Sequence, residues 1–141
     1  MHELARDRTV IAIAHRLSTI AAADQIAVLE KGCITQQGTH GDLVKVPGRY
    51  RSFWRERQQA AAALANRCDC MVVVGGKNSG NTRRLAQICA DACAHTHHIE
   101  EASELEAAWF ATAHHIGITA GASTPQEHIE RAVARIKELC R

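Results

Sequence analysis

The stretch Met71-Val72-Val73-Val74-Gly75-Gly76-Lys77-Asn78-Ser79-Gly80 decides how the second half of this chain folds. It opens with four consecutive apolar residues, a pattern typical of a strand that is buried on both faces. A polar loop with glycines follows, and then a helix from about residue 81 to 93 with an apolar face. The order strand, loop, helix is the repeating unit of a parallel α/β sheet.

The same order recurs twice before the C-terminus. Residues 96–99 predict a second strand, and Ser103 with Glu106 forms a capping box that predicts a helix after it. Residues 116–119 predict a third strand. Three such units predict an α/β fold with a small, three-layer, Rossmann-like parallel sheet.

The last helix has a strong start signal. Thr124 is a capping residue, Pro125 suits the first helical position, and Glu127 completes a capping box. An apolar stripe then runs to the C-terminus through Ile129, Val133, Ile136 and Leu139.

The first half predicts shorter elements. These are a buried strand over 9–14, a short helix capped by Ser18 and Thr19 that runs to Ala23, a hairpin of 25–29 and 33–37 around Lys31-Gly32, a helix capped by Thr39 and ended by Pro47-Gly48, and a longer helix over 50–67.

The composition excludes several classes of protein. Among 141 residues, 17 Lys and Arg face 15 Asp and Glu, so no strong field favours nucleic acid or a membrane surface. The start Met1-His2-Glu3-Leu4 lacks the features of a secretory signal, and charged residues interrupt every apolar run. The chain is expected to be cytoplasmic and not inserted in a membrane.

Six cysteines and nine histidines raise the question of a metal site. The pairs Cys68-x-Cys70 and Cys89-x-x-x-Cys93 match neither a zinc ribbon nor a redox pair, and the histidines lack well-spaced partner ligands. The cysteines are expected to be reduced thiols, and no metal site is predicted.

Two polar loops precede helices at the carboxyl edge of the predicted sheet. Residues 77–82 offer a cation, hydroxyls and amides, and residues 119–124 offer hydroxyls and small side chains. Exposed N–H groups and the helix dipole make such loops suitable for phosphate. The alternative is that these hydroxyls only cap the helices.

The residues from Cys68 to Leu85, together with Gly117-Ile118-Thr119-Ala120-Gly121-Ala122-Ser123-Thr124-Pro125, resemble the final domain of LytB-type 4-hydroxy-3-methylbut-2-enyl diphosphate reductases. The resemblance covers roughly residues 57–141. It implies an oxidoreductase of isoprenoid biosynthesis, in which an iron–sulfur cluster held by three cysteines reduces an allylic alcohol. The products are isopentenyl and dimethylallyl diphosphate.

The resemblance also implies a diphosphate-binding site made of Ser79, Asn81 and Ser123. The family usually has a second serine at the position of Gly80. Its last cluster cysteine falls close to Arg51, where this chain has none, and the other ligands belong to earlier domains. The 4Fe–4S cluster of the parent family is therefore not expected to bind, and the chain alone is expected to be inactive.

A second resemblance concerns the first half. Arg8-Thr9-Val10-Ile11-Ala12-Ile13-Ala14-His15-Arg16-Leu17-Ser18-Thr19-Ile20, with matching segments to about residue 59, is similar to the C-terminal end of an exporter-type ABC transporter ATPase. It implies that His15 is a nucleotide-switch histidine and that this part contacts a transporter subunit. The P-loop and the Walker B motif are absent from the sequence, so the histidine is expected to be inert.

The two resemblances predict a fusion of an ATPase remnant, residues 1–57, with a reductase domain, residues 58–141, joined between Tyr50 and Leu64. A gene-assembly artefact, a genomic rearrangement and a deliberate chimera would give the same sequence. Three functions remain open: a diphosphate-binding fragment of the reductase, a fragment of a transporter ATPase carrying the switch histidine, and a binding module without catalysis.

Overall fold

The structure is a computed structural model that describes residues 9–13, 20–21 and 23–141. Its regular elements form two sheets, an antiparallel pair near the N-terminus and a parallel sheet of three strands. In chain order they are β1 (Ile26–Glu30), β2 (Cys33–Gly38), α2 (His40–Leu43), α3 (Arg49–Ala65), β3 (Cys70–Val74), α4 (Gly80–Ala92), β4 (Thr96–Ile99), η2 (Ala102–Glu104), η3 (Ala107–Phe110), β5 (Ile116–Ala120) and α5 (Gln126–Leu139).

The strand β3 lies at the centre of the parallel sheet. It pairs in parallel with β4 on one side and with β5 on the other, giving the order β4-β3-β5. All five of its residues are buried, as the unbroken apolar run predicts. The α/β class and the small parallel sheet predicted from the sequence are therefore confirmed.

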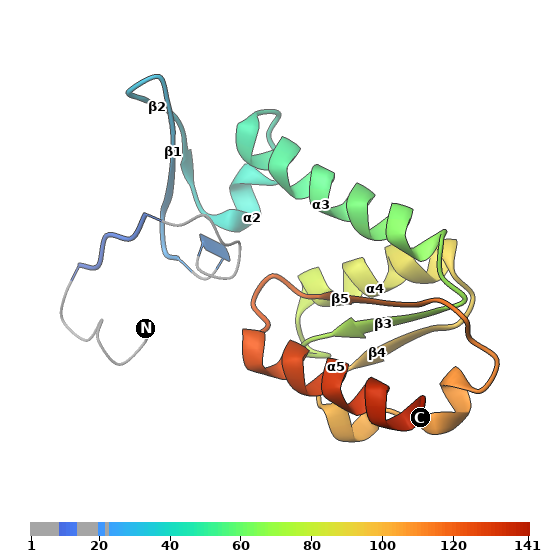
Figure 1. The fold of residues 1–141 in the computed structure, drawn as a ribbon. Coiled ribbons are helices and arrows are strands. Elements are labelled where there is room, and N and C mark those ends of the chain that lie inside the picture. The colour runs from blue at the N-terminus through green and yellow to red at the C-terminus, as the bar shows by residue number, and fades with distance from the viewer. Residues whose placement is uncertain (1–8, 14–19, 22) are drawn as a thin grey trace.

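Helices cover both faces of this sheet, so the domain has three layers (Figure 1). Met71 and Val73 pack with Ala61 and Ala65 of α3 and with Cys89 of α4. The alternate residues of β3 point to the other face, where the core contains Val72, Val74, Ile99, Phe110 and Ala132. Because side chains alternate along a strand, β3 contributes to both cores.

The hairpin of β1 and β2 has a small core of its own. Lys31 and Gly32 have φ values of 50° and 82°, the left-handed values that a two-residue hairpin turn requires. Behind the hairpin, Ile26, Leu43 and Tyr50 are buried against one another. The hairpin and the turn at Lys31-Gly32 are confirmed as predicted.

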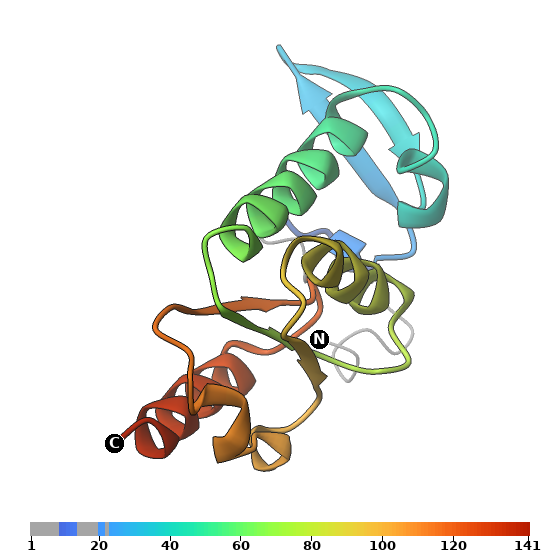
Figure 2. The same cartoon turned by 90° about the vertical axis from the view of Figure 1, so that its right-hand side faces the viewer.

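The helix α3 connects the two cores. In both views it runs from the hairpin at its N-terminal end to the parallel sheet at its C-terminal end (Figures 1 and 2). Tyr50 belongs to the core behind the hairpin, whereas Ala61 and Ala65 belong to the core of the sheet. The helix is unbroken across the range predicted to contain a joint.

Three predicted elements differ in the structure. Residues 9–13 are not a buried strand: Ile11 and Ile13 are fully exposed or nearly so, at 91% and 104%. Neither sheet contains them. An apolar run favours burial, but a strand also needs a neighbouring strand to pair with its backbone groups, and neither sheet provides one. The predicted helix cap, Ser18 and Thr19, and the predicted switch histidine, His15, lie outside the described residues, as does Ala14 at the end of the predicted strand.

The segment after β4 also differs from the prediction. In place of a helix capped by Ser103 and Glu106, two short 3₁₀ turns form, and the capping box consists of Glu101 and Glu104. Leu105 is extended and buried between the two turns, and its burial ends the first one. The earlier helix α2 likewise ends at Leu43, before Pro47-Gly48.

Candidate functional site

The two polar loops meet at the carboxyl end of β3. The backbone N–H of Gly121 donates to the carbonyl oxygen of Val74 at 2.9 Å. The hydroxyl of Thr124 donates to the same oxygen at 3.0 Å. The second loop is therefore fixed to the strand from which the first loop departs, so both loops lie at one edge of the sheet, as the sequence predicts.

The hydroxyl of Thr124 does not cap α5 as predicted. The residue at the N-cap position is Pro125, and no side chain caps this helix. Because the Thr124 hydroxyl bonds to the Val74 carbonyl, it is not available to the first turn of α5. The predicted capping box with Glu127 is therefore wrong, and the N–H groups of that turn have no side-chain acceptor from a cap.

Ser79 is held at the N-terminus of α4. Its backbone N–H donates to the carbonyl of Gly76 at 3.0 Å, which closes a turn. Its hydroxyl accepts from the N–H of Thr82 at 3.3 Å, as an N-cap does. Ser79 therefore caps the helix, which was the alternative to phosphate binding. Because the hydroxyl oxygen only accepts in this bond, its hydrogen can still be donated to another group.

Two glycines allow the loops to approach each other closely. A Cβ at Gly121 would lie 2.2 Å from the hydroxyl oxygen of Thr82, and a Cβ at Gly75 would lie 2.5 Å from that of Thr124. Gly75 also has a φ of 145°, which disfavours any other residue. The hydroxyl of Thr82 is fully buried and has no hydrogen-bond partner among the described residues.

Asn81 lies on the exposed side of the first turn of α4, where its side chain contacts a histidine from the N-terminal half. Its amide nitrogen lies 3.0 Å from Nε2 of His40. Nδ1 of the same ring lies 2.8 Å from the hydroxyl of Tyr50. The ring also packs on Trp54 with a centroid distance of 4.5 Å. A residue 41 positions away in the sequence therefore touches the candidate site.

Ser123 is exposed in the loop after β5. The N–H of Thr124 donates to the carbonyl of Gly121 at 3.0 Å, so Ser123 occupies the third position of a β-turn. The structure places Ser79 and Asn81 on one helix turn and Ser123 on the neighbouring loop.

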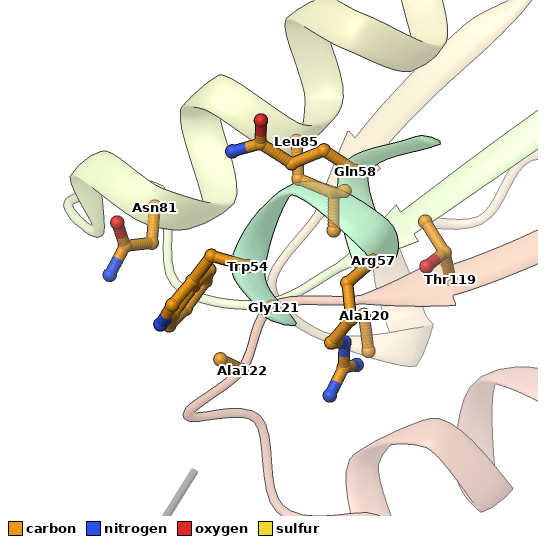
Figure 3. A pocket seen from close by; sticks show the side chains of 9 residues that line it. All are labelled: Trp54, Arg57, Gln58, Asn81, Leu85, Thr119, Ala120, Gly121 and Ala122. Atoms are coloured by element: carbon orange, nitrogen blue, oxygen red, sulfur yellow. The ribbon is translucent and has the colours of Figure 1, made fainter. Parts of the chain in front are cut away.

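A small pocket of about 30 Å³ lies between these elements (Figure 3). Its walls are Trp54, Arg57, Gln58, Asn81, Leu85, Thr119, Ala120, Gly121 and Ala122. Of the three predicted residues, Asn81 lines it, whereas Ser79 and Ser123 do not. Among the residues that the structure describes, the lining contains one cation, Arg57, and no carboxylate, a balance that favours an anionic ligand.

Lys77, the cation predicted for the first loop, is paired with Glu104. The hydrogen bond from Lys77 and those from two backbone N–H groups hold the pKa of Glu104 at about 2, well below its usual range. This carboxylate offsets the charge of Lys77. Arg57 is then the cation that lines the pocket.

The cysteines do not form a metal centre in the part of the chain that the structure describes. Burial raises the pKa of both Cys70 and Cys89 to about 11, and the two side chains lie in the packed cores on opposite faces of the sheet. The resemblance places the family's last cluster cysteine close to Arg51, and the helix α3 that carries Arg51 contains no cysteine. The residues present do not fit an iron–sulfur cluster.

Sequence reasoning missed three residues of this site: His40, Trp54 and Arg57. Arg57 lies at the start of the segment that resembles the reductases, where a basic residue could have been noted. His40 offers no such signal, because its place beside Asn81 depends on how the hairpin and α3 fold together.

The fold and the loops define a small parallel α/β domain with two polar loops at the carboxyl edge of its sheet, and comparison with known proteins narrows this class. A model of the LytB protein family matches residues 53–137. The 4-hydroxy-3-methylbut-2-enyl diphosphate reductase of Pelobacter propionicus is 39% identical over 127 residues, 90% of this chain and 45% of that protein. The reductase of Geobacter metallireducens is 52% identical over 83 residues, 59% of this chain and 29% of that protein.

A solved structure of (E)-4-hydroxy-3-methyl-but-2-enyl diphosphate reductase has the same fold. It superposes with a TM-score of 0.59 at 47% identity, over 60% of this chain and 30% of that one. The chain belongs to the LytB family. It spans less than half the length of the reductases it matches.

In the described residues, no helix is long and apolar enough to cross a membrane.

Proposed function

We propose that this chain binds the diphosphate group of an isoprenoid precursor and corresponds to the substrate-anchoring part of a 4-hydroxy-3-methylbut-2-enyl diphosphate reductase. The observation that carries the proposal is the double attachment of the second loop to the Val74 carbonyl, through Gly121 and Thr124. It holds two loops with free donors at one sheet edge. The identity with reductases over the same residues supports the choice of ligand.

The three side chains would act as donors to phosphate oxygens. The Ser79 hydroxyl keeps its hydrogen while capping α4, and the first-turn N–H groups of that helix add positive potential. Asn81 would donate from its amide, and Ser123 from its exposed hydroxyl. Gly80 has no hydroxyl, so the backbone N–H is the donor that remains at that position.

The reduction itself is not assigned to this chain. The relatives named above are reductases, but α3 has no cysteine near Arg51, where the resemblance places the last cluster ligand. The thiols of Cys70 and Cys89 are buried in the cores of the sheet. The chain is proposed as a fragment that binds substrate and requires further polypeptide for catalysis.

The test is a two-dimensional amide NMR titration of the labelled protein with isopentenyl diphosphate, with isopentenol as the phosphate-free control. Shifts confined to residues 79–82 and 121–124, absent with the alcohol, are expected. A dispersed spectrum that does not respond to the diphosphate would contradict the proposal.

The origin of the residues before 53 is a separate proposal. Their resemblance to an ABC transporter ATPase favours a remnant, residues 1–57, with a joint between Tyr50 and Leu64, inside α3. The match to the Pelobacter propionicus reductase covers 90% of the chain and so includes most of these residues, which favours a single origin. If the chain is a fusion, single-molecule sequencing of the source DNA through codons 45–70 separates a gene-assembly artefact from a genomic rearrangement or a deliberate chimera. A transporter contact and a switch function for His15 would follow only from the remnant.

A further inference from the structure

The N-terminal half contributes one side chain to the edge where the two loops meet. His40, the first residue of α2, has Nε2 at 3.0 Å from the amide nitrogen of Asn81. Asn81 is one of the three proposed diphosphate donors. An oxygen atom that accepted a hydrogen bond from Asn81 would therefore lie within reach of the imidazole of His40.

The imidazole ring is held in place by α3. Its Nδ1 lies 2.8 Å from the Tyr50 hydroxyl, and its ring packs against both Trp54 and Tyr50 at centroid distances of 4.5 and 5.8 Å. Tyr50 itself is buried. A side chain fixed by two aromatic neighbours loses little further freedom when a ligand binds, which favours a binding function.

We propose that His40 is a fourth diphosphate-binding residue, which donates a hydrogen bond from Nε2 to the same phosphate as Asn81. The inference rests on the proposed diphosphate site. It makes that site a product of both halves of the chain.

The ring nitrogens of His40 keep a hydrogen-bond partner each when the ligand binds. Nε2 lies 3.0 Å from the amide nitrogen of Asn81 and 3.4 Å from its Oδ1, and we assign the ligand-free ring the tautomer of the shorter contact. In that tautomer the Asn81 amide donates to Nε2, and Nδ1–H donates to the Tyr50 oxygen 2.8 Å away. With ligand, the Asn81 amide turns to the phosphate and the ring takes the other tautomer, losing a proton at Nδ1 and gaining one at Nε2 from solvent. The Tyr50 hydroxyl then donates to Nδ1, because a phenol can both donate and accept. No net proton is gained or lost.

The charges nearby suit an anion. Arg57, also on α3, lines the adjoining pocket, and no carboxylate of the described residues does. The acidic residue on the helix of His40 is Asp42, which accepts hydrogen bonds from the side chain and the backbone of Thr39. That carboxylate is engaged in the capping box of α2.

The experiment measures the dissociation constant of isopentenyl diphosphate by calorimetry for the full chain and its variants. His40→Ala is expected to weaken binding about 5- to 20-fold, as the loss of one hydrogen bond to a charged group does. Tyr50→Phe, which keeps the edge-to-face contact of the two rings but removes the partner of Nδ1, is expected to weaken it about 2- to 5-fold. His114→Ala, at an exposed histidine just before the opposite end of β5, is the matched control and should leave it unchanged.

A second measurement covers the case in which His40→Ala does not fold. In the wild-type protein, long-range ¹⁵N spectra of the imidazoles should show Nε2 of His40 changing from acceptor to donor at saturation with the ligand. An unchanged Nε2 signal, or His40→Ala binding as tightly as wild type or tighter, overturns the inference. If binding depends on Ser79 but not on His40, the inference about His40 is wrong and the proposed diphosphate site stands. If the wild-type protein does not bind the ligand, both are wrong.

Discussion

The hydroxyl oxygen of Thr82 lies where a side chain on Gly121 would have to be: a Cβ there would come within 2.2 Å of it. The two residues belong to different segments: Thr82 to the first turn of α4, and Gly121 to the loop after β5. Their contact sets how closely the two loops approach. Because the Thr82 side chain is fully buried, it has no space into which to move.

Gly121→Ala is therefore expected to destabilise the domain by about 1–3 kcal/mol, the usual effect of an extra methyl group in a packed region. It should also weaken diphosphate binding, because it separates the loops. Urea denaturation and calorimetry measure the two effects. Gly80→Ala is the control, since a Cβ at that position meets nothing within 4 Å, and it should change stability by less than about 1 kcal/mol.

Ser79→Ala and Ser123→Ala separate capping from ligand binding. Ser79→Ala removes the side chain that accepts from Thr82, so it should cost about 1 kcal/mol of stability and also weaken binding. Ser123 is exposed, so Ser123→Ala should weaken binding at unchanged stability. Thermal unfolding and calorimetry on the same samples give the comparison. Equal affinity of both variants and the wild type would show that the serines only shape the loops.

The carboxylate of Glu104 should make stability depend on pH. Its pKa is about 2 in the folded protein and about 4.5 in an unfolded chain. A depressed pKa stabilises the fold above the unfolded value, and this contribution is lost as pH falls from about 4.5 to 2. Because the side chain is partly exposed, solvent screening reduces its size.

Glu104→Gln tests this contribution through urea denaturation at several pH values. The variant should be less stable than wild type near neutral pH, and the difference should shrink as pH falls through about 2 and vanish below it, where the wild-type carboxyl is protonated too. Glu127→Gln removes a carboxylate from an exposed pair within α5 and serves as the control. A difference between wild type and Glu104→Gln that is constant with pH would contradict the assignment.

The six thiols should differ widely in reactivity. Cys33 and Cys140 are exposed, whereas Cys70 and Cys89 are buried and have pKa values raised to about 11. Since the thiolate is the reactive form, iodoacetamide at mildly alkaline pH should modify the exposed pair within minutes and the buried pair only on unfolding. Peptide mass spectrometry follows each site. Early modification of Cys70 would show that β3 is not the buried strand described above.

Local signals in the sequence predict the parallel sheet well. The run Met71–Val74 indicates burial on both faces, and the turn residues Lys31-Gly32 indicate a hairpin. In a parallel sheet the carboxyl ends of all strands lie at the same edge. The order of strands and helices along the chain is therefore enough to place the loops of Ser79 and Ser123 at that edge.

The failures have a common cause: they depend on contacts, made or missing, between segments far apart in the chain. The Thr124 hydroxyl serves Val74, 50 residues away, so it does not cap the helix beside it. The exposed residues 9–13 have an apolar pattern without a partner. His40 reaches Asn81 only because α3 holds the two cores together. No local pattern contains that information.

The helix α3 has a consequence for how this chain tolerates change in length. The helix buries Tyr50, Ala61 and Ala65. Ala61 follows Tyr50 by 11 positions and Ala65 follows Ala61 by 4, while Trp54, which packs on the hairpin core, follows Tyr50 by 4. At about 100° per residue these separations place all four on one stripe roughly 60° wide. One residue inserted between Trp54 and Ala61 would turn the hairpin core by about 100° around the helix axis relative to the sheet. It would carry His40 away from Asn81 while leaving each core intact, so the rotational phase of one helix governs whether the two halves share a site.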